Sequence, residues 1–225
     1  MRDIGEFEMK FNDYLKTLVG PPKFAVVATT GLKEEDEIIA LSYCGEEGAP
    51  KTIIRRILDQ DKLLAAYDIH KFSPEIVRDS GMDDGQFMDI VRQDLAGPVF
   101  TYNPAFQESF LARLDPSGES PVRFVDLPLL WKGMNAYMEL SPDIADVIKL
   151  QEAAKKLVGK APGFTRLAKT LFLSQPYPAA YPCEGSCALL QGLFLGLGAE
   201  LPIQETKDQP RLQARQAERW PLRAY

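Results

Sequence analysis

Histidine and cysteine are scarce in this chain of 225 residues, which contains one histidine and three cysteines. A four-coordinate structural zinc site is therefore hard to build, even with Cys183 and Cys187 as two of its ligands. The cysteines, which include Cys44, also lack the even number and regular spacing of a disulfide framework. We expect free thiols in a reducing compartment.

Long apolar runs and an excess of positive charge are missing as well. No stretch of about 18 apolar residues occurs, and the N-terminal segment carries acidic side chains where a signal peptide needs a positive flank. These absences predict a cytoplasmic protein without a membrane partner. The net charge of −6 repels a phosphate backbone at long range, although a local basic stripe can still bind one. The chain also contains no glycine-rich phosphate loop, Ser/His/Asp order or Cys/His pair.

The residues that are present fit one α/β domain. Hydrophobic residues make up 45% and charged residues 26% of the chain, which is enough apolar surface to offset the chain entropy lost on folding. Single domains of this class commonly run to about 200–250 residues. We divide the chain into an N-terminal docking helix within residues 1–22, a domain over 23–203, and a polar tail over 204–225.

Apolar spacing predicts the elements of this domain. A helix over 6–19 ends at Gly20, and runs at 24–29, 37–44 and 51–58 predict a three-stranded meander. The later elements are a helix over 83–95, a strand over 99–102, a helix over 104–114, a strand over 122–127, a helix begun by Ser141 as cap and Pro142, and a buried helix over 186–197. This order predicts a mixed sheet covered by helices.

The polar tail carries arginines at four-residue spacing. They are Arg211, Arg215, Arg219 and Arg223. This pattern indicates either a solvated helix or fraying tail, or a basic arm that touches nucleic acid or a protein partner.

The first chemical motif lies at the end of the first predicted strand. The segment VVATTGLKEEDEIIALSY resembles the D-x-E-T-T-G-L motif of the DnaQ-like (DEDD) 3′–5′ exonucleases, the family of proofreading and ribonuclease T type enzymes. Residues 29–32 match this motif. Its two acidic positions fall on Val26 and Ala28, so the turn is kept and both carboxylates are lost.

The second motif of the family is H-N-x-x-F-D-x-x-F-L, which the segment TYNPAFQESFL resembles. Gln107 stands at the metal-binding aspartate and Tyr102 at the preceding histidine. IHKFSPEIV and FVDLPLL, which contains Asp126, resemble two further stretches of the family. The matching positions of the second motif are Asn103, Phe106, Phe110 and Leu111.

The third motif, H-x-A-L-x-D-A, resembles YPCEGSCALLQGLF. Tyr181 then stands at the general-base histidine and Ser186 at the last aspartate. The motifs follow the family order over residues 24–197, and the resemblance implies a ribonuclease H-like, three-layer α/β fold. It also places His70 in a loop before the second motif, away from the catalytic base, so we expect a structural hydrogen-bonding role for this histidine.

The resemblance implies a two-metal mechanism in which Mg²⁺ or Mn²⁺ ions about 4 Å apart activate water. Such hard cations need carboxylate oxygens, and the four ligand positions here hold uncharged residues, Val26, Ala28, Gln107 and Ser186. We therefore expect the family's catalysis to be absent and no cofactor to be bound. Nearby acids that could rebuild a metal site are Glu34, Glu35, Asp36, Glu108 and Glu184, although Glu108 should face away.

Three functions remain open. The first is a catalytically silent protein whose cleft binds a single-stranded nucleic-acid end or serves as a scaffold, through the residues that would receive the terminal nucleotide: Thr29, Thr30, Gly31, Asn103 and Phe106. Phe106 is also compatible with a place in the core, and the threonines with a plain turn. The second is a protein-interaction module that uses helix 6–19 or the tail. The third is an active nuclease with relocated Mg²⁺ or Mn²⁺ ligands.

Overall fold

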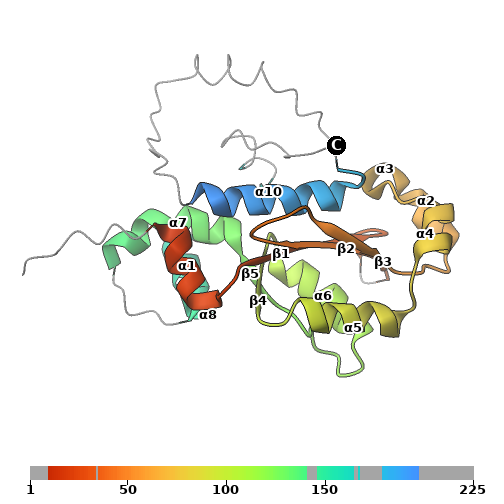
Figure 1. Ribbon diagram of the computed structural model, residues 1–225, viewed down its shortest axis with the longest axis horizontal. Coiled ribbons are helices and arrows are strands. Elements are labelled where there is room, and N and C mark those ends of the chain that lie inside the picture. Colours follow the sequence, from red (N-terminus) through yellow and green to blue (C-terminus); the bar gives the residue numbers. More distant parts are fainter. Residues whose placement is uncertain (1–9, 34, 141–145, 165–166, 168–178, 198–225) are drawn as a thin grey trace, which may run out of the picture.

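The computed structural model describes residues 10–33, 35–140, 146–164, 167 and 179–197 (Figure 1). Within them lies one five-stranded sheet with the order β3-β2-β1-β4-β5. The strands β1, β2 and β3 form an antiparallel meander, while β4 and β5 run parallel to β1. The strands are β1 (Lys23–Thr29), β2 (Ile38–Gly45), β3 (Lys51–Ile54), β4 (Pro98–Thr101) and β5 (Arg123–Asp126).

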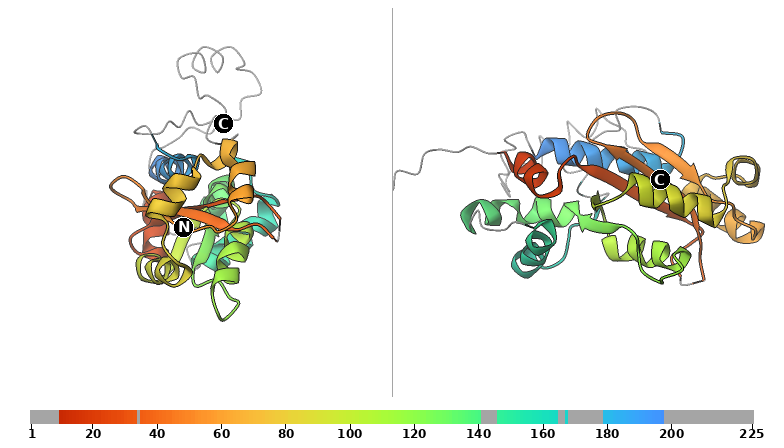
Figure 2. Two further views of the ribbon diagram at one scale, coloured as in Figure 1. Left: turned by 90° about the vertical axis from the view of Figure 1, so that its right-hand side faces the viewer. Right: turned by 60° about the horizontal axis from the view of Figure 1, so that its bottom comes forward.

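Helices cover both faces of the sheet. Figure 1 shows α10 along one face and α5 and α6 on the other, while α1, α7 and α8 gather at one end of the sheet and α2, α3 and α4 at the opposite end. The second view in Figure 2 agrees with this placement. The helices are α1 (Phe11–Val19), α2 (Gln60–Ala65), α3 (Tyr67–His70), α4 (Pro74–Ser80), α5 (Asp84–Asp94), α6 (Pro104–Leu114), α7 (Leu127–Leu140), α8 (Val147–Val158) and α10 (Pro182–Gly196).

The strand β1 is buried on both faces, as expected for a central strand. Its side chains alternate between two apolar clusters, because successive residues of a strand point to opposite sides. Ala25 and Val27 belong to the cluster that includes side chains of α5 and α6. Phe24, Val26 and Ala28 belong to the cluster that includes side chains of α1, α7, α8 and α10. This arrangement confirms the predicted three-layer α/β fold with a mixed sheet between helices.

Most predicted elements are confirmed within one or two residues. The meander, α5 and α6 occur where apolar spacing placed them. The helix α5 begins with a capping box. The side chain of Asp83 accepts from the backbone N–H of Gln86, and the side chain of Gln86 accepts from the backbone N–H of Asp83. The helix α10 begins at Pro182, four residues before the predicted start, because proline is favoured in the first turn of a helix.

Other boundaries differ from the prediction. The strand β3 ends at Ile54, four residues before the end of the run predicted at 51–58. Lys10 is extended, so α1 begins at Phe11, and residues 6–9 of the predicted helix lie outside the described residues. The helix α8 begins at Val147, because the side chain of Asp146 accepts from the backbone N–H of Ile148 at 2.7 Å. The predicted cap at Ser141 lies outside the described residues, as does the polar tail.

Several helices were not predicted. The strand β5 ends at Asp126, and α7 follows directly, because the Asp126 carboxylate accepts from the backbone N–H of Leu129 at 3.0 Å and so satisfies a donor of the first helical turn. The short helices α2, α3 and α4 were also missed. No helix among the described residues is long and apolar enough to cross a membrane.

Truncation of an aromatic side chain at the centre of the larger apolar cluster should cause a large loss of stability. Phe24, Phe100 and Phe194 form a ring triangle with centroid separations of 5.9, 5.4 and 5.3 Å. Phe194→Ala should lower the free energy of unfolding by about 4 kcal/mol. Leu195→Ala, at a neighbouring side chain that is 47% exposed, should lower it by about 1 kcal/mol or less. Urea unfolding measures both values, and equal losses would contradict this description of the core.

Candidate functional site

The parallel strands β1 and β4 are paired at one position, Phe24 with Phe100, and the side chain of Gln107 joins them beyond it. Its Oε1 accepts from the backbone N–H of Val27 on β1 at 3.0 Å. Its Nε2 donates to Thr101 Oγ1 at 2.5 Å and to the carbonyl oxygen of Tyr102 at 2.9 Å. The Thr101 hydroxyl in turn donates to the Ala25 carbonyl at 2.7 Å.

This bridge requires a carboxamide. Gln107 is 1% exposed, and its one acceptor and its donor group are both used. A carboxylate in the same place could accept from Val27 but could not donate to Thr101 or Tyr102. The position that the resemblance assigns to a metal-binding aspartate is therefore occupied by a neutral strand-to-strand connection.

Buried apolar side chains stand at the two positions that the resemblance assigns to the acids of the first motif. Val26 is 1% exposed and Ala28 is 9% exposed, and both lie in the cluster that includes α10. Tyr102 packs against this cluster and lies near Ser186 of α10. Burial is the largest influence on Tyr102 and raises its pKa, so the phenol is neutral at physiological pH.

Tyr181 and the cysteines complete this neutral region. The ring of Tyr181 stacks on Phe72 with centroids 4.0 Å apart, and burial raises the pKa of its hydroxyl. Ser42 donates to Cys183 Sγ at 3.1 Å, and burial raises the pKa of Cys183 to about 11. Cys187 donates to the carbonyl oxygen of Phe24 at 3.4 Å. A general base or thiolate at these positions would have to form against this desolvation.

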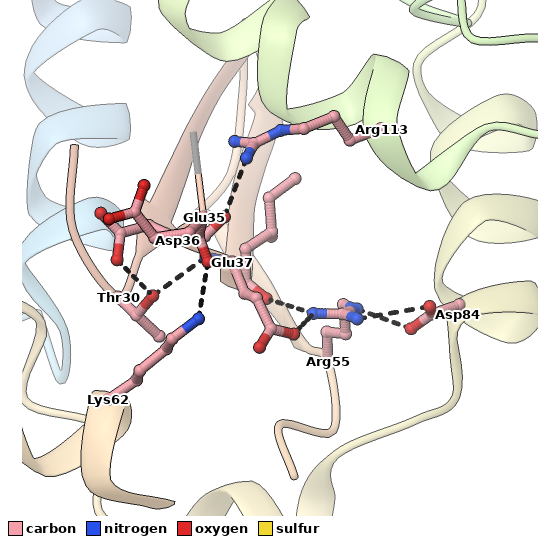
Figure 3. A network of polar contacts seen from close by, with 9 residues as sticks. Thr30, Glu35, Asp36, Glu37, Arg55, Lys62, Asp84 and Arg113 are labelled. Atoms are coloured by element: carbon pink, nitrogen blue, oxygen red, sulfur yellow. Dashed lines mark hydrogen bonds and ion pairs between the residues drawn. The ribbon is translucent and has the colours of Figure 1, made fainter. Parts of the chain in front are cut away.

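The Thr-Thr-Gly turn after β1 is held by its own loop (Figure 3). Thr29 Oγ1 donates to the Gly31 carbonyl at 2.6 Å. Thr30 Oγ1 accepts from the backbone N–H of Glu37 at 2.9 Å and donates to Asp36 Oδ1 at 3.4 Å. A Cβ on Gly31 would lie 2.3 Å from Asp36 Oδ2, so a larger residue here would displace this carboxylate.

Three cations fix the loop from outside, as Figure 3 shows. Lys62 donates to the carbonyl oxygen of Glu35 at 2.7 Å, and Arg113 of α6 donates to that of Asp36 at 3.0 Å. Arg55, which is 9% exposed, forms ion pairs with Glu37 at 2.9 Å and with Asp84 at 2.6 Å. The loop acids Asp36 and Glu37 are therefore engaged in holding the turn.

The predicted nucleotide-end residues fall into separate places. The turn lies beside the carboxyl end of α6, where Arg113 contacts its loop. Asn103 is exposed at the opposite end of α6, in a left-handed conformation with φ 51°. Phe106 is half-buried, packs with Phe110 at a centroid distance of 4.7 Å and contributes to the cluster on the α5 and α6 side. The described contacts do not join the turn to Asn103.

A pocket of about 680 Å³ opens beside Asn103. Tyr102 and Phe164 line it with their rings stacked at a centroid distance of 4.6 Å. Asp126 also lines it and is 8% exposed, and burial raises the pKa of its carboxyl. Sequence analysis did not identify this pocket. The only signal for it was Asp126 at the end of a predicted strand.

The residues at the four ligand positions do not fit a hard divalent cation, since none of them is a carboxylate. The nearby acids have other partners: Glu108 Oε1 accepts from the backbone N–H of Phe124 at 3.0 Å and Glu184 Oε2 from that of Ala180 at 2.9 Å. Glu34 lies outside the described residues. Among the described residues, no group of three or more His, Cys, Asp or Glu is arranged to hold a metal ion.

His70 is 3% exposed and stacks on Phe72 with centroids 5.9 Å apart, on the ring that also stacks on Tyr181. It therefore lies one ring away from Tyr181, closer than the resemblance implied. Its Nδ1 accepts from the backbone N–H of Phe72 at 2.9 Å, which leaves the hydrogen on Nε2 to bond the Leu63 carbonyl at 2.9 Å. Burial lowers the pKa of this imidazole. Both ring nitrogens are thus used in joining α2 to the chain after α3, which is a structural role.

Comparison with known proteins adds a structural similarity. No family model matches the sequence, and no curated protein matches it significantly. Among solved structures, the chain is similar to a moderately thermophilic Exonuclease I from Methylocaldum szegediense, with a TM-score of 0.48 and 14% sequence identity. The alignment covers 88% of this chain and 44% of that chain, so this chain spans less than half the length of that protein.

The bridge predicts a specific stability loss. Gln107→Ala leaves the Val27 N–H without an acceptor and removes the donor to Thr101, so the free energy of unfolding should fall by about 3 kcal/mol. Gln93→Ala, at an exposed position of α5, should change it by about 0.5 kcal/mol or less. Urea unfolding of both variants checks this, and similar values for the two would refute the bridge.

Asp126→Asn should change stability in a pH-dependent manner. Burial raises the pKa of Asp126 in the folded state. The stability that the protonated carboxyl contributes to the fold is therefore fully present below the unfolded-state pKa. It is lost as pH rises through the folded-state pKa. The variant amide still accepts from Leu129 but carries no charge. Its free energy of unfolding relative to the natural protein should therefore increase between about pH 4 and about pH 7. Urea unfolding at both pH values measures this difference, and a constant difference contradicts it.

Proposed function

We propose that this protein is a catalytically silent relative of the DnaQ-like 3′–5′ exonucleases that binds the end of a single-stranded nucleic acid without a metal ion. The observation that carries the proposal is the Gln107 bridge. A neutral carboxamide whose oxygen and nitrogen both join β1 and β4 supplies no carboxylate charge to a cation at that point.

The other ligand positions support the same proposal. Val26 and Ala28 offer no oxygen ligand from their side chains, and Ser186 offers only a neutral hydroxyl. Mg²⁺ dehydrates reluctantly and is held in proteins by carboxylate and phosphate oxygens. Two such ions cannot be held here by four uncharged side chains, so the water activation that the resemblance implies has no basis in these residues.

Loss of the acidic ligands favours nucleic-acid binding in another respect. A cleft without clustered carboxylates repels phosphate less, and the shape-determining residues of the motifs remain. Of these, Asn103 is the exposed one with access to a pocket. We retain Thr29, Thr30, Gly31, Asn103 and Phe106 as the proposed nucleotide-end set, with Asn103 as the residue whose side chain is free to make contacts.

A protein-interaction module is the second candidate. Its support is an exposed apolar group near α2 and α3, formed by Leu58, Leu64 and Ile69 at 88%, 54% and 73% exposure. The helix α1 is a weaker candidate for such contacts, because Phe11 and Leu15 are buried in the domain's own core.

The deciding experiment combines calorimetric titration of Mn²⁺, a 3′-end degradation assay and fluorescence anisotropy with labelled single-stranded DNA and RNA. We expect no saturable metal binding, no degradation, and metal-independent strand binding that weakens as salt rises. Asn103→Gly keeps the positive φ and removes the side chain, so it should weaken strand binding about fivefold, whereas Gln93→Ala should leave it unchanged.

Each other outcome selects a different function. Mn²⁺-dependent degradation that Glu108→Ala or Glu34→Ala abolishes would establish the active nuclease. Absence of strand binding even at low salt would leave the protein-interaction module, because an electrostatic complex is strongest under that condition.

A further inference from the structure

The pocket beside Asn103 lies at the carboxyl ends of two parallel strands. Tyr102 directly follows β4 and Asp126 ends β5, and both line the pocket of about 680 Å³. Ligands of open α/β sheets commonly bind outside the carboxyl ends of their strands, and pockets for small molecules measure about 300–1,000 Å³. The location and the volume both suit a small organic ligand.

One side of this pocket favours an anion. The helix α6 begins here with Asn103, Pro104 and Ala105, and no side chain caps its first turn. The positive end of the helix dipole therefore faces the pocket. Pro104 carries no N–H, and that of Phe106 donates to the Asn103 carbonyl at 3.1 Å, so Ala105 supplies the N–H of the first turn that can bind an anion. Lys155 and Lys160 line the same pocket, and among the described residues neither lysine forms an ion pair. Two acidic side chains also line the pocket: Glu152, one turn before Lys155 on α8, and Asp126.

Another side favours a flat ring with N–H donors. Tyr102 and Phe164 form a stacked aromatic wall with an interplanar angle of 7°, a surface on which a base can pack. Asp126 accepts one hydrogen bond, from Leu129 to Oδ1. Its Oδ2 has no hydrogen-bond partner among the described residues, although the side chain is 8% exposed. A ligand N–H bonded to this oxygen would offset the cost of burying the carboxylate.

We propose that this pocket binds one nucleotide unit, with its phosphate at the start of α6 beside Lys155 and Lys160 and its base between the Tyr102–Phe164 wall and Asp126. The assignment rests on the proposed function and names the place where the strand end is held. The proposed binding site is thus the space between α6 and α8. It lies beside the positions on β1 that the resemblance assigns to metal ligands, and not at those positions.

The probes are guanosine 5′-monophosphate, guanosine and inorganic phosphate, titrated calorimetrically into the full chain without metal. Guanine presents N–H donors to Asp126, and the monophosphate supplies the anion. We expect saturable binding of the monophosphate, with guanosine and phosphate each binding at least about tenfold more weakly, since each makes one part of the contacts.

Variants test the two sides of the pocket separately. The pair Lys155→Ala and Lys160→Ala should weaken the monophosphate about tenfold and leave guanosine unchanged, whereas Asp126→Asn should weaken both about fivefold, because its amide presents N–H groups toward the base. The matched control is Lys149→Ala, at an exposed lysine of the same helix that does not line the pocket.

Competition with a single-stranded oligonucleotide separates this assignment from the function on which it rests. Displacement of the monophosphate by the strand, with both weakened by the lysine pair, supports the assignment. Strand binding that the pocket variants do not change overturns it and leaves the proposed function standing. Monophosphate binding without strand binding leaves the pocket standing and removes the proposed function, and absence of both overturns both.

Discussion

The Gln107 carboxamide is the contact on which the arrangement of this domain depends. The parallel pair of β1 and β4 is connected by the backbone at one position, and Gln107 and Thr101 supply the further hydrogen bonds between these strands. The strands β4 and β5 and the helix α6 are thereby fixed against the antiparallel meander. Because every polar atom of the amide is used, this site is part of the sheet and not a set of free ligands.

The same connection organises the two regions at the ends of α6. At its carboxyl end, Arg113 fixes the loop that closes the Thr-Thr-Gly turn. At its amino end, Asn103 leads into the pocket that Asp126 and Phe164 also line. Since Gln107 ties the helix to β1, neither end can shift without breaking buried hydrogen bonds, and both regions are held in fixed geometry.

The sequence predicted what depends on local spacing. The helix α6 was predicted to the residue because apolar side chains repeat along it and Pro104 opens it. The helix α7 was missed because the apolar run after Asp126 suits a strand as well as a helix, and the deciding contact is the cap on Leu129. The motifs alone predicted that uncharged residues stand where the resemblance places metal ligands. The bridge was not predicted, because Gln107 and Val27 are 80 residues apart.

The packing around Val26, Ala28 and Tyr102 limits how this chain can change in evolution. A single substitution that restores an acid at Val26 or Ala28 would bury a charge without a cation or a hydrogen-bond donor beside it, at a cost of several kcal/mol. The same change at Gln107 would break the strand connection before any metal could compensate. Several simultaneous substitutions would be needed to build a set of carboxylate ligands here, so a metal site could not arise in single steps without a loss of stability.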